Sequence, residues 1–163
     1  MSLSVAGRTR LEPVERFLSK QAITAMYRYR LFDHTADLGV EVYGKTANEL
    51  FANAAFAVFD ILADLSHVSP IVERKVAVDG EGWEDLLVNY LREILYMYNG
   101  EGLLLKEFSV LDIDPRHLEG RVAGEPFDPA KHTINTEIKA VTYHQAAVRE
   151  APQEWTARVI FDV

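Results

Sequence analysis

The chain has 163 residues, of which 48% are hydrophobic and 26% charged, a composition typical of one folded globular domain. Its formal net charge of −8 argues against non-specific binding to nucleic acid, which depends on basic side chains. The absence of cysteine excludes disulfides, thiolate catalysis and cysteine-ligated zinc. Because no stretch of the chain is apolar for long enough to span a membrane, we expect a cytoplasmic protein.

Residues 1–25 lack the long apolar core of a secretory signal. Their apolar residues would form at most one or two amphipathic turns. We therefore expect a disordered leader, a cloning remnant or a start assigned too early, with Met26 as the natural first residue. The folded domain is predicted to span residues 26–163.

The first half of this domain predicts two strands followed by two helices with a strand between them. Alternating side chains indicate strands over residues 27–32 and 38–43. Thr46 and Glu49 have the spacing of a capping box, which predicts a helix from there to about residue 62. Residues 71–79 indicate a third strand, and an apolar stripe from Trp83 predicts a second helix that ends at Asn99 and Gly100.

The last third of the chain reads as β-structure. Candidate strands cover residues 103–113, 118–123, 136–143, 145–150 and 155–161. Strands that occur in groups around two helices indicate an α+β fold rather than a doubly wound one. We therefore predict a single domain in which antiparallel or mixed sheets pack against two amphipathic helices.

Carboxylates gather near both ends of the predicted domain. Asp33, His34 and Asp37 directly precede the strand at 38–43, and the chain ends with Asp162 and the terminal carboxylate of Val163. If the last strand lies beside Asp37, these oxygens would form a site for a hard cation such as Ca²⁺ or Mg²⁺. The alternative is ordinary turn chemistry, in which Asp and Thr side chains bond nearby backbone amides.

A lysine lies in the strand predicted at 136–143. Strand alternation would place Glu137, Lys139, Val141 and Tyr143 on one face. Lys139 could contact a phosphate or a carboxylate there, or it could be a solvated lysine that protects a sheet edge from aggregation. His144, at the strand end, fits a functional site or an ordinary surface or core position.

Motifs of self-contained enzymes are missing from the chain. It has neither the Gly-rich loop with Lys that cradles nucleotide phosphates nor the Gly-x-Ser-x-Gly turn of hydrolases. A nucleotide-driven enzyme or a self-contained hydrolase therefore finds little support.

Three blocks of the sequence together resemble the archease family. They are residues 29–44 (YRLFDHTADLGVEVYG), residues 137–144 (EIKAVTYH) and the closing Phe161-Asp162-Val163, with two amphipathic helices between the first two. The resemblance covers residues 27–163. It implies a small α+β protein that assists the RtcB-type RNA ligase, the GTP-dependent enzyme that joins tRNA exons and repairs cleaved RNA. Such a protein promotes guanylylation of the ligase's active-site histidine and sustains multiple turnover.

The resemblance also implies roles for individual residues. The family's metal ligands fall on Asp37, Asp162 and the terminal carboxylate of Val163, with calcium the usual ion and Mg²⁺ or Mn²⁺ also compatible with oxygen ligands. Its functionally important lysine falls on Lys139. His34, Thr142 and His144 match motif positions to which the resemblance assigns no individual roles. His34 and His144 are candidates to orient the ligands.

The same resemblance sets the expected partners. The protein would act as an accessory of the ligase and contact RNA only through it, with its acidic surface docked on a basic face. Two alternatives remain from other classes of protein. One is a stand-alone metal-dependent phosphoesterase in which Asp37 and His34 hold a cation and an attacking water; the other is a chaperone or adaptor with a structural metal.

Overall fold

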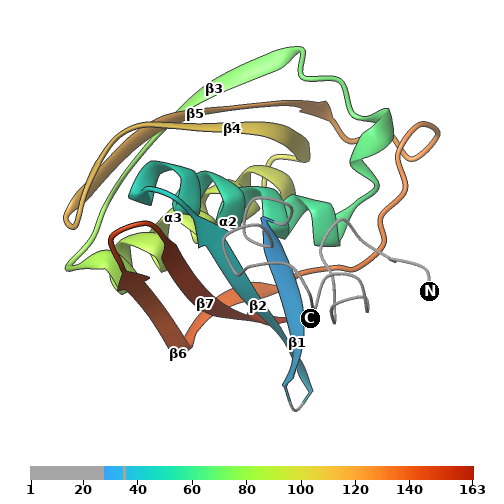
Figure 1. Cartoon of the computed structure of the whole chain (residues 1–163). Coiled ribbons are helices and arrows are strands. Elements are labelled where there is room, and N and C mark those ends of the chain that lie inside the picture. Colours follow the sequence, from blue (N-terminus) through green and yellow to red (C-terminus); the bar gives the residue numbers. More distant parts are fainter. Residues whose placement is uncertain (1–27, 35) are drawn as a thin grey trace.

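Two antiparallel sheets enclose two helices in the computed structural model, which describes residues 28–34 and 36–163 (Figure 1). The predicted leader at 1–25 lies outside the described residues. The four-stranded sheet has the order β1 (Tyr29–His34), β2 (Asp37–Gly44), β7 (Trp155–Asp162) and β6 (Ala140–Glu150). The three-stranded sheet has the order β3 (Val72–Asp79), β5 (His117–Pro126) and β4 (Leu103–Asp114). The predicted α+β class is confirmed, and all strand pairs within both sheets are antiparallel.

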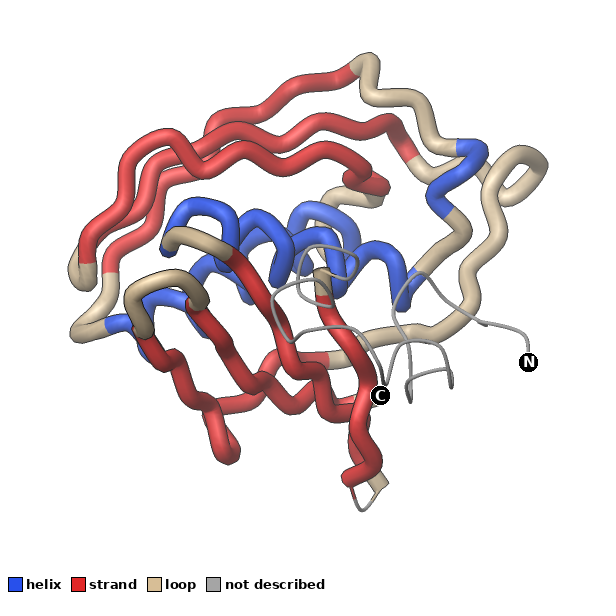
Figure 2. The backbone as a smooth tube through the Cα atoms, in the orientation of Figure 1, coloured by secondary structure: helices blue, strands red, loops and turns tan. Residues whose placement is uncertain are grey.

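Helix α2 (Ala47–Leu62) lies between the sheets and is therefore buried on most of its circumference (Figure 2). Its apolar face follows the i, i+3, i+4 spacing of a helix, and all seven residues of this face are buried: Leu50, Phe51, Ala54, Ala55, Val58, Phe59 and Leu62. Thr46 caps the helix as predicted, since its hydroxyl accepts a hydrogen bond of 3.1 Å from the amide of Glu49. The Glu49 carboxylate in turn accepts from the amide of Lys45 at 3.1 Å.

Helix α3 (Trp83–Asn99) begins after Gly82, whose φ of 123° favours glycine. The carboxylate of Asp85 accepts a hydrogen bond of 2.8 Å from the amide of Glu81, which satisfies a donor near the helix start. The helix ends at Asn99 with Gly100 as its C-cap, as the sequence predicts. Among the described residues, none of the helices is both long and apolar enough to cross a membrane.

The predicted strands at 136–143 and 145–150 are one strand, β6, which begins only at Ala140. A register shift between Thr142 and Ala147 creates a wide bulge, with Gln145 at a φ of 54°. Ile138 and Val141 are both buried, although strict alternation would place them on opposite faces. The prediction that residues 137–143 alternate regularly is therefore wrong, because residues 136–139 lie outside the ladder.

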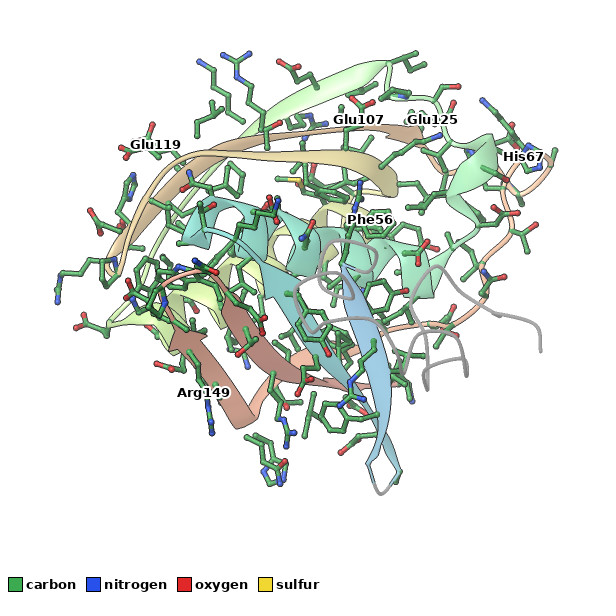
Figure 3. The ribbon with its side chains drawn as sticks, in the orientation of Figure 1. Phe56, His67, Glu107, Glu119, Glu125 and Arg149 are labelled. Carbon is green, nitrogen blue, oxygen red and sulfur yellow. The ribbon has the colours of Figure 1, made fainter. Side chains whose placement is uncertain are left out.

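A buried polar cluster ties two loops to the end of the three-stranded sheet, where Figure 3 labels Glu125. The Glu125 carboxylate accepts hydrogen bonds from Lys131 at 2.9 Å, from the Ser69 amide at 2.6 Å and from His132 Nε2 at 3.0 Å. The bond from Lys131 first, and then that from Ser69, lowers the pKa of Glu125 to about 2. This cluster holds the loop after the 3₁₀ helix η2 (Leu65–His67) against the chain that follows β5.

Candidate functional site at the end of the four-stranded sheet

The ladder between β2 and β7 brings the two predicted aspartates together. Its last pair is Leu38 with Phe161, so Asp37 and Asp162 are the next residues on their strands and lie across from each other. Their neighbours Leu38 and Phe161 point toward the helices, with Phe161 1% exposed. Asp37 and Asp162 therefore lie on the opposite, outer face of the sheet.

The ladder between β6 and β7 adds the lysine and the chain end. Ala140 pairs with Asp162, which makes Lys139 and Val163 the next residues across. The Lys139 amide donates a hydrogen bond of 2.7 Å to the Asp162 carbonyl. Lys139, Asp162 and Val163 are all exposed, with Val163 38% exposed. The predicted carboxylates and the predicted lysine thus meet at one exposed end of the sheet.

The two histidine candidates differ in position. His34 is paired with Asp37 in the ladder between β1 and β2, but its side chain lies outside what the structure describes, as does that of Asp33. His144 is exposed in the β6 bulge, which faces Val159, and its amide donates to the Thr142 hydroxyl at 3.3 Å. Val159 is three residues from Asp162 on β7, about 10 Å along a strand. His144 is therefore not next to Asp162 in the ladder.

The hairpin that carries Asp37 is held by close packing on its outer face. The ring of Phe32 lies over Gly39, where an added Cβ would come within 2.3 Å of the ring. The guanidinium of Arg158 also lies over the Phe32 ring, at 4.6 Å from its centroid. Any side chain at position 39 would require the Phe32 ring to move, so the glycine allows this ring to lie against the strand. At the turn, Ala36 has a φ of 62°.

The donor set at this end of the sheet consists of oxygen atoms. Within the described part of the chain, no three His, Asp or Glu side chains come together as a metal site. The candidate donors are instead the side chains of Asp37 and Asp162 and, as the sequence analysis expects, the terminal carboxylate of Val163. Carboxylates that face each other across a ladder repel, and a hard cation offsets such repulsion while using oxygen ligands. The residues therefore fit an ion such as Ca²⁺, Mg²⁺ or Mn²⁺.

Two side chains of α3 that the sequence does not mark as functional contact the segment around Lys139. Asn99 Nδ2 donates to the Ile138 carbonyl at 3.1 Å, and Arg92 Nε donates to the Val141 carbonyl at 3.0 Å. They are seven residues apart, about two helical turns, so they share a helix face. Their residue types do not mark them as functional, because an asparagine at a helix end is also common as a cap. Only their spacing on one helix face could have indicated a shared role.

A cleft of about 220 Å³ lies elsewhere, between α2 and β4. Its lining comprises Arg28, Ala52, Asn53, Phe56, Lys106, Glu107 and Phe108. Figure 3 shows Phe56 and Glu107 at this position. Arg28 precedes β1, whereas the carboxylates follow its far end, about 20 Å away along six residues of strand. The cleft is therefore separate from the candidate site.

Known proteins match both the sequence and the fold. The archease protein family matches residues 29–163. A protein archease from Sulfurisphaera tokodaii is 39% identical over 140 residues, covering 85% of this chain and 100% of that protein. One from Pyrococcus furiosus is 37% identical over 142 residues, with the same coverage of 85% and 100%.

Solved structures agree with these relatives. The solution structure of protein 1598 from Methanobacterium thermoautotrophicum superposes with a TM-score of 0.72 at 34% identity, covering 83% of this chain and 99% of that one. A crystal structure of an archease and possible chaperone from Thermotoga maritima has a TM-score of 0.55 at 22% identity, which supports the fold alone. The match over residues 29–163 and the identity to full-length relatives show that this chain belongs to the archease family.

Proposed function

We propose that this archease activates an RtcB-type, GTP-dependent RNA ligase by promoting guanylylation of the ligase, and so sustains its turnover in tRNA splicing and RNA repair. We further propose that it is an accessory protein with no catalytic residues of its own. The observation that carries the proposal is the meeting of Asp37, Asp162, the chain terminus and Lys139 at one exposed sheet end.

The chemistry of these groups suits phosphate transfer on another protein. Asp37, Asp162 and the terminal carboxylate of Val163 would hold a divalent cation, for which Ca²⁺ is our first candidate and Mg²⁺ or Mn²⁺ the others. A cation held there would supply positive charge to the oxygens of a phosphoryl group. Lys139 would add a second positive charge as a flexible ammonium. Of the two histidine candidates, His34 is the one paired with Asp37 in the ladder and would orient the ligands, whereas His144 lies in the bulge.

The location of the site favours presentation to a partner. Lys139, Asp162 and Val163 are exposed, whereas the cleft between α2 and β4 lies at the other end of β1. A group that must enter the active site of another enzyme has to project from the surface, whereas an enzyme working alone encloses its substrate in a pocket. The net charge of −8 suits docking on a basic, RNA-binding face, so RNA would be contacted only through the ligase.

RNA ligation by an RtcB-type ligase from the same source, with GTP and Mn²⁺, tests the proposal directly. Product per ligase molecule should exceed one only when the archease is present. Asp37→Ala and Lys139→Ala should each lower this stimulation at least about tenfold, because the first removes a ligand of the cation and the second removes an ammonium, and both positive charges would stabilise a transferring phosphoryl group. Matched controls on the other sheet are Asp112→Ala and Lys75→Ala, both exposed, which should retain stimulation.

The same assay separates the alternatives. Turnover of a phosphoester by the purified archease alone, lost in Asp37→Ala, would support a phosphoesterase instead. Unfolding of the archease on chelation, without any effect on ligation, would support a chaperone or adaptor with a structural metal. Unchanged stimulation by Asp37→Ala would contradict the proposed role of the carboxylates.

A further inference from the structure

We propose that Arg92 and Asn99 of α3 are positioning residues that fix the backbone around Lys139 beside Asp162. The inference rests on the proposed function, because it assigns to these residues the placement of the lysine that would act on the ligase. It goes beyond that function by extending the machinery to a helix that carries none of the ligands.

The segment that carries Lys139 lacks the support of a regular ladder. β6 begins at Ala140, so residues 136–139 lie outside the strand. β6 is also an edge strand, paired only with β7. Backbone groups on its other side need partners, and an unsupported edge is free to shift. Apart from the one backbone bond between the Lys139 amide and the Asp162 carbonyl, the segment therefore needs support from outside the sheet.

Side chains of α3 provide that support at two carbonyls that bracket the lysine. Asn99 donates to the Ile138 carbonyl at 3.1 Å, one residue before Lys139, and Arg92 donates to the Val141 carbonyl at 3.0 Å, two residues after it. The Lys139 amide itself donates to the Asp162 carbonyl at 2.7 Å. Three hydrogen bonds thus fix four consecutive residues.

Packing strengthens the same attachment. The Ile138 side chain is 1% exposed and anchors the segment in the core, while the Lys139 side chain stays exposed. A buried residue next to an exposed one gives the lysine a defined direction. The freedom that remains belongs to its own side chain rather than to the backbone.

The polar face of α3 continues along β6 and holds the bulge. The Arg92 guanidinium lies 4.7 Å from the centroid of the Tyr143 ring, and the Tyr143 hydroxyl donates to Asp85 at 2.6 Å. Farther along, the Val148 amide donates to the Glu84 carboxylate at 3.0 Å. Because Arg92 touches both the bulge and the Lys139 segment, it couples the two.

Hydrogen exchange measures the attachment without the ligase. In Asn99→Ala, the Lys139 amide should exchange at least about tenfold faster than in the wild type, because its segment loses one of three fixed points. Amides in the centre of β2, such as Val40, should keep their rates. The matched control is Asn48→Ala, which removes a similar bond of 3.0 Å from α2 to the Val110 carbonyl on the other sheet. An unchanged Lys139 amide in Asn99→Ala would overturn the proposal.

Ligation shows whether this positioning matters for function. Asn99→Ala should lower the maximal stimulation about tenfold while leaving the archease concentration for half-maximal stimulation unchanged, as Lys139→Ala should. A general loss of structure would change both values. Arg92→Ala serves as the second variant and should act in the same direction, whereas Asn48→Ala should change neither value.

The outcomes are distinguishable from failure of the proposed function. If the wild-type protein does not stimulate ligation, the proposed function is wrong, and the exchange experiment alone decides whether α3 fixes the segment. If exchange at Lys139 accelerates in Asn99→Ala but maximal stimulation is unchanged, the positioning role is overturned although the contact is real.

Discussion

Both sheets end in facing acidic side chains, but the two ends balance their charges differently. In the three-stranded sheet, His117 lies between two carboxylates, at 2.6 Å from Asp79 and 2.9 Å from Glu119. In the four-stranded sheet, the ladder sets Asp37 opposite Asp162, with Lys139 and Val163 directly beside Asp162. At the first end an imidazole bonds both carboxylates, whereas at the second end the nearby lysine belongs to a segment outside the ladder.

The contrast supports the proposal that the acidic cluster of the four-stranded sheet, rather than that of the three-stranded sheet, binds a cation. A carboxylate pair that bonds an imidazole from its own sheet is satisfied by folding. A group of three carboxylates on adjacent strands is costly to assemble unless a cation accompanies it. The four-stranded sheet is built from both ends of the domain, β1 and β2 with β6 and β7, so its site forms only when the whole domain has folded.

The largest expected effect comes from breaking the layer that both sheets share. Phe51 of α2 is 0% exposed and packs near the rings of Trp83 and Tyr90, at centroid distances of 5.9 and 6.2 Å. Phe51→Ala should lower the free energy of unfolding by about 3–5 kcal/mol through the cavity it leaves. Denaturant unfolding measures this loss, and both sheets should unfold in one transition. Phe56→Ala, at the half-buried cleft, should cost less; two separate transitions would contradict a common core.

The next effect concerns the acidic ends themselves. We expect Asp162→Asn to weaken Ca²⁺ binding at least about 100-fold, since even groups outside the first ligands contribute 10–100-fold. Asp112→Asn, an equally exposed aspartate on the three-stranded sheet, should leave the affinity unchanged. Isothermal titration calorimetry on the full chain gives both values. Equal losses in the two variants would mean that binding reflects overall charge rather than a site.

Much of the fold could be predicted because its local signals are strong. The capping pair at Thr46 and Glu49, and the apolar face of α2, gave a helix whose end at Leu62 agrees with the structure. The sequence predicts two strands where the structure has the single strand β6, because the bulge interrupts the alternation of side chains. No glycine marks the residue with a positive φ, Gln145. Where tertiary contacts from α3 hold an irregular backbone, sequence pattern alone does not describe it.

The candidate site was predictable in its members but not in its support. Asp37 and Asp162 are 125 residues apart in the sequence. They lie together because β2 pairs with β7 in a register that the apolar pattern of the two strands sets. Asn99 and Arg92 were missed because their bonds reach backbone carbonyls, which no residue type marks. His144 is close to Lys139 in the sequence, but it lies in the β6 bulge, away from the pair of Ala140 with Asp162.

The smallest expected effect tests the self-contained cluster at the end of the three-stranded sheet. The hydrogen bond with Asp79, and next that with Glu119, raises the pKa of His117 to about 8, above its usual 6.5. Because the folded pKa is raised, the stabilisation from protonated His117 is fully present below pH 6.5 and is lost as the pH rises through 8. In the wild type, the unfolding free energy should therefore fall slightly as the pH rises from 6.5 to about 8. His117→Gln should lack this fall, as measured by denaturant titration at several pH values. Asp79→Asn should lower the His117 pKa toward its usual value, as followed by NMR of the imidazole. A wild-type His117 that titrates near 6.5 would mean that solvent screens the exposed carboxylates of Asp79 and Glu119. The two sheet ends would then not differ in whether a protonated histidine balances their carboxylates.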